Sequence, residues 1–468
     1  MNTTTLVAAE TFAVEHFSGA LLGDQRRSKR LVEVAACLVS EPRGTLHGAI
    51  NSWAALNAAY RLLSSESATL DNVTAPHRNK VFKACGQARE VLLIEDTTTL
   101  NYSTLQHVKD MGWIGDEEDC KGLHLHTTLA MGVESWNAEH EPQLTVLGVF
   151  ALNCWTRLQP KRRKGEKKFA RLQRDRESQR WAADFEKRDG PPPGTRWTYV
   201  ADRESDIFEV FQKCREKRVD WIVRANQPRA LEDEGESLFS AVAQAKSLGR
   251  YAVKLRARPN QKRRKAMLEV RATLVTLRGP QRPGGRLEPE TMNVVEVREV
   301  DPPEGVEAIH WVLLTSWPID NLQAALRVAR SYARRWVIEE FHKALKSGVG
   351  AEDSQLTNAR SIQALVGILA IIALRLMNMK LLSRTRPDER LQEEAIGAEA
   401  LQLLEQKYRA PKGGWTNRTV LTAIARIGGY LARKNDSPPG WQILWQGWHR
   451  LMTMVEGVRL FMGGQKCV

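Results

Sequence analysis

Five polar side chains recur at helical spacing in the second half of the chain. Gaps of three, four, four and three residues separate Tyr332, Arg335, Glu339, Lys343 and Lys346. On a helix that turns by about 100° per residue, these gaps place all five on one outward face. A carboxylate among cations can be a surface network of salt bridges, which stabilises little. A salt-bridge network does not explain why all five residues stay on one face through four turns. A glutamate that holds a metal ion, flanked by cations that hold phosphate, explains this spacing better than a salt-bridge network does.

The opposite face of this segment is apolar, as in an amphipathic helix packed on a core. It carries Val337, Ile338, Phe341, Ala344 and Leu345. We therefore expect one long helix from about residue 322 to residue 346.

Two more carboxylates end apolar runs that predict buried strands. Asp96 closes the run VLLIED, and Asp202 closes the run WTYVAD. Acids at the carboxyl ends of strands lie where α/β proteins place their sites, and hard divalent ions such as Mg²⁺ prefer oxygen ligands. An acid in this position is also a common turn or helix-capping residue. Each acid alone is thus a weak indication, and three that converge on one sheet are a stronger one.

The order of the elements predicts an α/β fold with a mixed sheet to position these acids. Three β-rich segments follow one another from about residue 90, and helices then alternate with strands from about residue 178. Residues from about 230 to 310 break the alternation and are interpreted as a β-rich insertion. Residues 1–70 and those after 375 are expected to be helical.

Net charge indicates the class of partner. Lys and Arg number 69 against 55 Asp and Glu in 468 residues, which gives a net charge of +14. Such an excess attracts polyanions, and nucleic acid is the default candidate. Residues 161–180 and 254–265 form two basic runs, although either run alone is more often a solvated loop than a binding site.

The cysteine pattern and the hydropathy of the chain indicate in which cellular compartment the protein works. Six scattered cysteines without a C-x-x-C pair indicate neither a disulfide framework nor a cysteine-rich zinc site, which fits a reduced cytoplasm. The apolar run from Ala364 to Leu374 is too short to cross a bilayer and predicts a buried core helix, so no membrane partner is expected.

A helix that opens after Gly23-Asp24 has a basic first turn. Its Arg26, Arg27 and Arg30 could face phosphate while the following apolar residues pack. A solvated helix start is equally consistent with these three residues.

Two further patterns are assigned to structure. His124 and His126 share one face of a predicted strand, but no third nitrogen or sulfur ligand is near them in sequence. They are interpreted as structural or DNA-adjacent residues. Trp441, Trp445 and Trp448 form a helical stripe that is more typical of a core than of a ligand platform.

Five segments resemble, in order, the matching segments of the IS-four family of cut-and-paste bacterial transposases. They are GDQRRSKRLVEVAA, IEDTTTLNY, ADRESDI, HWVLLTSWP and YARRWVIEEFHKALKSGVGAE. The specific match is the family's Y-(2)-R-(3)-E-(6)-K signature, which falls on Tyr332, Arg335, Glu339 and Lys346 with every gap intact. It selects Glu339 over Glu340, in agreement with the helix geometry.

The resemblance implies a ribonuclease-H-like catalytic domain over residues 71–375, with Asp96, Asp202 and Glu339 as its acidic, metal-binding triad. It also implies a DNA-end-binding domain over residues 1–70 and a dimerisation domain over residues 376–468. In similar transposases the last helices form the dimer contact. We therefore expect the tryptophan stripe to be partly uncovered and to pair two copies of the chain.

The resemblance also implies DNA contacts. The residues that would make them are Arg26, Arg27, Arg30, Trp311, Tyr332, Arg335, Lys343 and Lys346. Trp311 matches a tryptophan that stacks near an extruded base, whereas by itself it would be assigned to the core because it opens an apolar strand. Residues 351–355 are less basic than expected of the family, so DNA contacts there are not carried over.

These observations lead to a hypothesis of cut-and-paste DNA transposition. Two Mg²⁺ ions about 3.5–4 Å apart, or Mn²⁺ in their place, would support phosphoryl transfer. By resemblance, the steps are end nicking, hairpin formation, hairpin opening and strand transfer to target DNA, by a homodimer in the bacterial cytoplasm. A DNA-binding regulator without catalysis and a structure-specific nuclease are the alternatives.

Overall fold

The computed structural model describes residues 9–41, 45–50, 52–105, 107–108, 110–115, 120–157, 189–233, 235–255, 263–391, 396–433 and 436–464. The basic run 161–180, the helix expected near residues 178–188 and most of the run 254–265 lie outside these residues.

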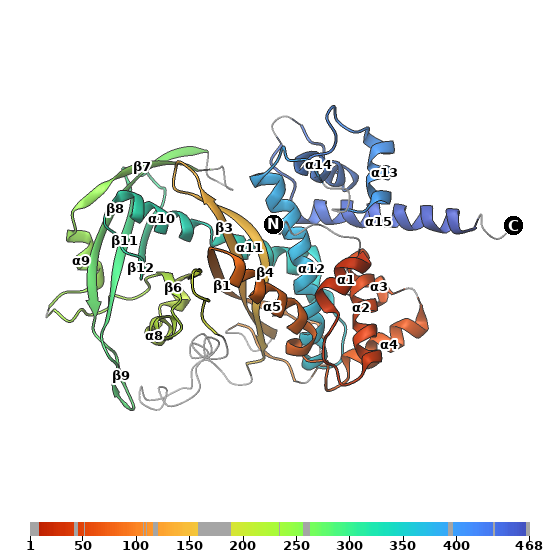
Figure 1. The fold of residues 1–468 in the computed structure, drawn as a ribbon, viewed down its shortest axis with the longest axis horizontal. Coiled ribbons are helices and arrows are strands. Elements are labelled where there is room, and N and C mark those ends of the chain that lie inside the picture. The colour runs from red at the N-terminus through yellow and green to blue at the C-terminus, as the bar shows by residue number, and fades with distance from the viewer. Residues whose placement is uncertain are drawn as a thin grey trace.

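A ten-stranded mixed sheet forms the centre of the molecule (Figure 1). Its strands are β1 (Glu90–Asn101), β2 (Gly112–Trp113), β3 (Lys121–Trp136), β4 (Pro142–Trp155), β5 (Arg196–Ala201), β6 (Asp220–Arg224), β7 (Ser247–Leu255), β8 (Arg264–Leu277), β11 (Glu290–Val300) and β12 (His310–Thr315). In the part β4-β3-β1-β5-β6, β3 runs antiparallel to its neighbours and β1, β5 and β6 are parallel. This is the ribonuclease-H-like order, which confirms the predicted fold class.

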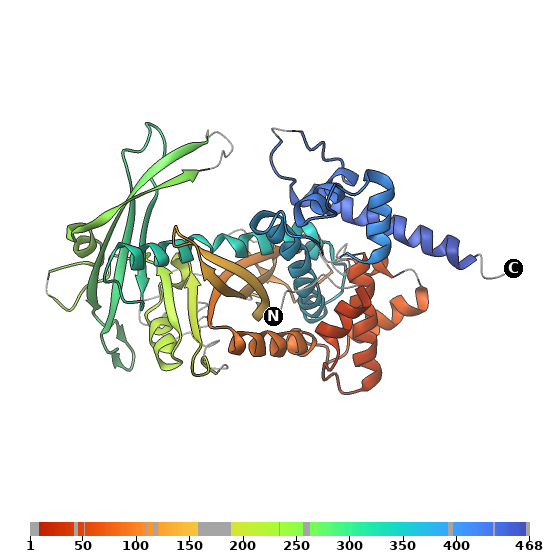
Figure 2. The same ribbon diagram turned by 45° about the horizontal axis from the view of Figure 1, so that its top comes forward.

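The β-rich insertion extends the same sheet. Strand β12 joins β6, and β11, β8 and β7 follow it outward. A two-stranded ribbon, β9 (Gln281–Arg282) with β10 (Gly285–Arg286), caps the loop between β8 and β11. The insertion therefore enlarges the central sheet and forms the end of the molecule opposite the helical regions (Figures 1 and 2).

Helices cover the sheet and build both terminal regions. The first group is α1 (Ala9–Phe17), α2 (Gln25–Ser40), α3 (Leu46–Ala49), α4 (Trp53–Leu63) and α5 (Leu70–Gln87). Helices α8 (Phe208–Glu216) and α9 (Leu238–Gln244) lie between strands along the chain, followed by α10 (Leu322–Ala333) and α11 (Trp336–Lys343). The last group is α12 (Ala359–Thr385), α13 (Ala398–Tyr408), α14 (Asn417–Ile427) and α15 (Trp441–Gly464).

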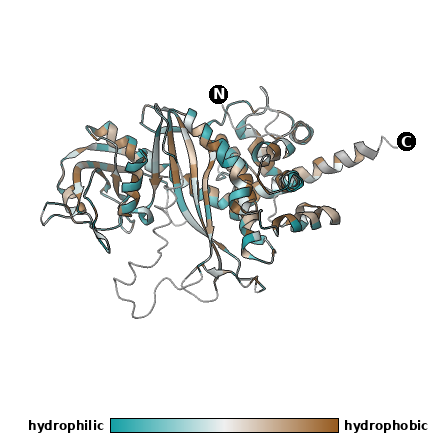
Figure 3. Ribbon diagram, turned by 60° about the horizontal axis from the view of Figure 1, so that its bottom comes forward, coloured by the Kyte–Doolittle hydropathy of each residue, from teal (hydrophilic) through white to brown (hydrophobic). Residues whose placement is uncertain are grey.

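Strand pleating divides the core into two layers. Leu92 and Ile94 pack on one side of the sheet, and Val91 and Leu93 pack on the other. Figure 3 shows hydrophobic residues along these strands and on the helices that meet them. The pleat therefore sends adjacent side chains of β1 into different environments.

Helix α12 is the central helical support. Asn358 caps its N-terminus by accepting a hydrogen bond from the Ser361 backbone N–H. Within the described ranges it is the one helix long and apolar enough to span a membrane, and 94% of its most apolar window is buried inside the protein. The predicted core helix at 364–374 is confirmed.

The expected single helix over residues 322–346 is wrong in one respect. It breaks at Arg334 and Arg335 into α10 and α11, and the helical path continues into a wider turn over Ala344–Gly348. At the break, the Val337 and Ile338 N–H groups bond to carbonyls three residues back instead of four. The apolar face is confirmed, since all five of its residues are buried.

Candidate active site

Two of the predicted acids meet at one edge of the sheet. Strands β1 and β5 pair in parallel, with Ile94 opposite Val200, so their continuations carry Asp96 and Asp202 to adjacent positions. Asp202 also caps a short 3₁₀ turn by accepting the Glu204 backbone N–H at 2.8 Å. Asp96 accepts the Thr97 backbone N–H at 2.8 Å. Backbone hydrogen bonds thus orient both carboxylates.

Arg335 links this edge to the third acid. Its Nη1 lies 3.1 Å from Asp96 Oδ2, and its Nη2 lies 2.7 Å from Glu339 Oε1. The break between α10 and α11 places Arg335 at the start of α11, one turn before Glu339. The structure therefore brings Asp96, Asp202, Arg335 and Glu339 into one cluster, as the sequence predicted.

The cluster holds an excess of negative charge. Burial and the nearby Asp202 carboxylate raise the pKa of Asp96 to about 6, although Arg335 opposes the shift. Burial would lower the pKa of Arg335, but the surrounding carboxylates, led by Asp96, raise it. A single guanidinium thus offsets part of the repulsion, and a further cation would be favourable here.

Tyr332 does not belong to the outward stripe predicted for it. Its ring is buried and meets Trp311 edge to face, with centroids 5.2 Å apart. Its ring packs against Trp311, and its hydroxyl interacts electrostatically with Arg335 and Asp202, so Tyr332 borders the cluster from the buried side. Of the other stripe residues, Glu339 and Lys343 are exposed, whereas Arg335 and Lys346 are half-buried. Trp311 is half-buried, packed on Tyr332.

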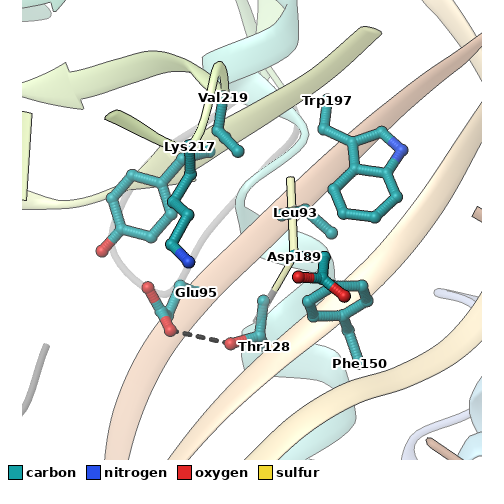
Figure 4. Close-up of a pocket in the computed structure, with 9 residues that line it drawn as sticks. Leu93, Glu95, Thr128, Phe150, Asp189, Trp197, Lys217 and Val219 are labelled. Carbon is teal, nitrogen blue, oxygen red and sulfur yellow. Dashed lines mark hydrogen bonds between the residues drawn. The ribbon is translucent and has the colours of Figure 1, made fainter. Parts of the chain in front are cut away.

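A buried polar layer, which sequence reasoning missed, lies behind Asp96. Glu95 points to the opposite face of β1 and is 2% exposed; its Oε1 accepts the Thr128 hydroxyl at 2.7 Å (Figure 4). His126 Nε2 is 2.8 Å from the same oxygen, and its Nδ1 is 2.8 Å from the Thr97 hydroxyl. Because Thr97 also donates its N–H to Asp96, this layer fixes the backbone beside the site.

The same layer reaches the second acid. Tyr199 interacts with Glu95, and its hydroxyl lies 2.9 Å from the Ser205 hydroxyl in the turn that Asp202 caps. A carboxylate next to Asp96 on an otherwise apolar strand was the sequence signal that could have indicated this layer. His126 is thereby a structural residue, as is His124, whose Nε2 lies 3.0 Å from the Trp113 carbonyl oxygen.

A second missed contact connects the site helix to the C-terminal region. Glu340, adjacent to Glu339, accepts hydrogen bonds from Lys380 Nζ at 2.8 Å and from Trp441 Nε1 at 3.0 Å. Lys380 Nζ also lies 4.2 Å from the centroid of the Trp441 ring. Glu340 therefore attaches α11 to α12 and α15.

Three family models match the chain. They describe a transposase DNA-binding domain over residues 9–68, a transposase DDE domain over residues 188–375 and a transposase Tn5 dimerisation domain over residues 371–464. All three matches are to transposase domains, and they leave residues 69–187 unmatched. Asp202 and Glu339 lie within the DDE match, and Asp96 joins them from outside it through the pairing of β1 with β5.

One similar solved structure is a cryo-EM structure of a piggyBac transposase synaptic complex with hairpin DNA. The two chains are 10% identical, and the TM-score is 0.30. The similarity covers 69% of this chain and 56% of that chain, so the present chain spans little more than half of the other's length.

DDE transposase domains use divalent metal ions. Among the residues that the structure describes, no group of three or more His, Cys, Asp or Glu side chains is arranged to hold a metal. In this arrangement Arg335 occupies the space between Asp96 and Glu339. The donors nevertheless fit such an ion, since they are carboxylate oxygens and the unbalanced charge at Asp96 favours a cation.

The region that matches the transposase DNA-binding model carries the predicted arginines on α2. Asp24 caps this helix by accepting the Arg26 backbone N–H at 2.8 Å. Arg26 and Arg27 are exposed, and Arg27 Nη1 is 3.1 Å from the Ser67 hydroxyl. Arg30 pairs with Glu33 at 2.7 Å. The first turn of α2 is thus a basic surface, and its contacts with DNA stay a prediction.

The tryptophan stripe lies in the region that matches the dimerisation-domain model. Trp441 and Trp448 are 9% and 3% exposed, and Trp445 is half-buried, so the chain itself covers most of the stripe. Exposed apolar residues instead follow along α15 at positions 454, 458 and 461, one helical face. Figure 1 shows this end of α15 projecting from the molecule. Trp441 contacts Glu340 of α11 and Lys380 of α12, and Trp448 contacts Arg375 of α12, so the interpretation of these two residues as core is confirmed. Pairing of two copies through the stripe stays a prediction.

Proposed function

We propose that this chain is a cut-and-paste DNA transposase of the IS-four family, similar to that of Tn5. The observation that carries the proposal is the cluster of Asp96, Asp202 and Glu339 around Arg335, just beyond the parallel pairing of β1 with β5. It combines an acidic triad with a cation in a chain whose regions match transposase domains for DNA binding, DDE chemistry and dimerisation.

The three carboxylates would hold two Mg²⁺ ions, with Mn²⁺ as a substitute. Bound ions would activate the attacking hydroxyl and offset charge on the leaving 3′-oxygen. Arg335 would exchange its contacts with Asp96 and Glu339 for a bidentate contact with a DNA phosphate. Exposed Lys343 and half-buried Lys346 would contact neighbouring phosphates, and Trp311 with Tyr332 would border the base nearest the cleaved bond.

One geometry can serve the successive steps because only the nucleophile changes. Water would nick the transposon end, and the freed 3′-hydroxyl would attack the opposite strand to form a hairpin. Water would then open the hairpin, and the same 3′-hydroxyl would join target DNA. The order of steps and the cytoplasmic, nucleoid-associated location belong to the proposal and rest on the family resemblance.

A homodimer would hold two ends together. The apolar face of α15 formed by Met454, Val458 and Phe461 offers a self-complementary contact. Serine substitutions at these three positions should abolish mixed two-end complexes in native gels with one short and one long end, while single-end binding persists. Mixed complexes that persist in the triple variant would place the pairing contact elsewhere.

The test of function is incubation of the purified chain with labelled candidate ends, target DNA and Mg²⁺. A transposase gives nicked, hairpin and joined products. Binding without cleavage would identify a regulator, and cleavage without joined products would identify a nuclease. Glu304→Gln, an exposed loop carboxylate, is the matched control for variants of the three acids.

A further inference from the structure

Arg375, in α12, is a buried cation for which the described residues supply no carboxylate partner. It is 7% exposed, and its Nε has no hydrogen-bond partner. Its Cζ lies 5.7 Å from the centroid of the Phe12 ring and 5.4 Å from that of Trp448. A buried charge without a counter-charge is strongly unfavourable, so charged groups at such positions are normally paired.

A cavity of about 30 Å³ borders this guanidinium. Its lining includes Phe12, His16, His77, Gly148, Arg375 and Asn378. On this measure roughly 10–15 Å³ is enough for one water molecule, so the cavity has room for a larger occupant. It lies where α1, α5, β4 and α12 meet, at the junction of the DNA-binding region with the rest of the chain.

Hydrogen bonding determines which atoms of the two histidines carry protons. The Val149 backbone N–H donates to His77 Nε2 at 3.0 Å, so the proton of that ring is on Nδ1. This Nδ1–H then donates to His16 Nδ1 at 2.9 Å, which leaves the His16 proton on Nε2. Gly148 permits the arrangement, since a Cβ there would lie 2.9 Å from His77 Nε2.

Both rings are therefore neutral, and the charge at the cavity is that of Arg375. Burial, with a smaller effect of the Arg375 charge, lowers the pKa of His16 to about 4. Burial lowers the pKa of Arg375 itself to about 10. At neutral pH the cavity thus combines one cation with N–H donors, and no acid is among its lining residues.

We propose that this cavity binds a small monovalent anion of the chloride class. The Arg375 guanidinium supplies the charge, and its N–H groups with His16 Nε2–H supply the donors. Phosphate and sulfate are larger than chloride, and a divalent anion would exceed the single positive charge of Arg375. A bound anion would join α1 to α12 and so stabilise the packing of the DNA-binding region on the core, independently of the proposed catalytic function.

Thermal unfolding of the full chain tests the proposal. Potassium glutamate is replaced stepwise by potassium chloride at constant ionic strength. The melting temperature of the wild type should rise saturably, by on the order of 2–4 °C relative to Arg375→Met. Arg360→Met, an exposed arginine on the same helix, should follow the wild type. An equal chloride response in wild type and Arg375→Met would overturn the proposal.

A second measurement uses the wild-type chain alone, so it does not depend on whether a variant folds. Crystals of the wild-type chain grown in sodium bromide should show an anomalous peak within hydrogen-bonding distance of the Arg375 guanidinium. Bromide crystals with water alone in the cavity would contradict the proposal whatever the melting curves show.

Discussion

Two pairs of adjacent carboxylates show how this chain separates chemistry from support. Glu95 and Asp96 are neighbours on β1, and Glu339 and Glu340 are neighbours on α11. Glu95 is buried with Thr128 and His126, and Glu340 is bonded to Lys380 and Trp441. Asp96 and Glu339 instead share one guanidinium at the open end of the sheet. The supporting member of each pair has its own fixed partners, whereas the proposed catalytic member retains charge for a cation.

The largest expected contrast is in DNA cleavage. Asp96→Asn and Glu339→Gln should lower the rate of end nicking in Mg²⁺ by at least about 10³-fold, because each removes a proposed metal ligand. Glu95→Gln and Glu340→Gln should retain measurable nicking, because their carboxylates face away from the site. Single-turnover assays on labelled ends make the comparison, with DNA binding measured in parallel. If both variants of a pair lost nicking activity to the same extent, the division into a catalytic and a supporting carboxylate would be wrong.

In the absence of metal, substitutions of Glu95 and Asp96 should change the free energy of unfolding in opposite directions. The folded-state pKa of Asp96 is raised to about 6, so its ionisation weakens folding as the pH rises from about 4 to 6, and the loss persists above that window. Asp96→Asn should therefore raise the free energy of unfolding at pH 7.5 by about 1–2 kcal/mol. Glu95→Gln should lower it by about 1–3 kcal/mol, because it disrupts a buried hydrogen-bonded group. Denaturant titration in EDTA measures both, and a stabilising Glu95→Gln would contradict the account.

Removal of the hydroxyl at position 97 should produce a smaller effect on metal use. Thr97→Val keeps the shape of the side chain but loses the contact with His126 Nδ1. The Mg²⁺ concentration for half-maximal nicking should rise by about 10-fold, as for residues that orient metal ligands. Thr97→Ser retains the hydroxyl and should restore the wild-type value. Identical Mg²⁺ curves for all three proteins would show that the buried layer does not position Asp96.

The smallest expected effect lies far from both pairs, on α2. Arg26→Ala with Arg27→Ala should lower the slope of log affinity against log salt by about 0.9 for each lost phosphate contact, so by less than 2 in total. Nicking at saturating protein should be unchanged, because these residues contact DNA away from the triad. Fluorescence anisotropy at several salt concentrations gives the slope. A slope equal to that of the wild type would show that both arginines face solvent.

Sequence patterns predicted the elements whose signals are local. The apolar run placed Asp202 directly after β5, and the spacing on α11 separated Glu339 from the buried face. The expectation that Asp96 ends its strand is wrong, because β1 continues to Asn101 through its pairing with β3. The buried position of Tyr332 could not be predicted, because only tertiary packing brings the Trp311 ring against it. The partners of Glu95 and Glu340 could not be predicted either. Thr128, Lys380 and Trp441 are distant in sequence, and only the tertiary packing of β3, α12 and α15 brings them into contact.

Binding of Mn²⁺ to the end-bound chain tests the central claim most directly, because it compares Glu339 with Glu340 at a single site. Electron paramagnetic resonance of free Mn²⁺ would count the ions bound by wild type, Glu339→Gln and Glu340→Gln in complex with a transposon end. We predict that wild type and Glu340→Gln bind the same number of ions with similar affinity and that Glu339→Gln loses at least one of them. Unchanged binding by Glu339→Gln, or an equal loss in Glu340→Gln, would contradict the assignment of the acidic triad.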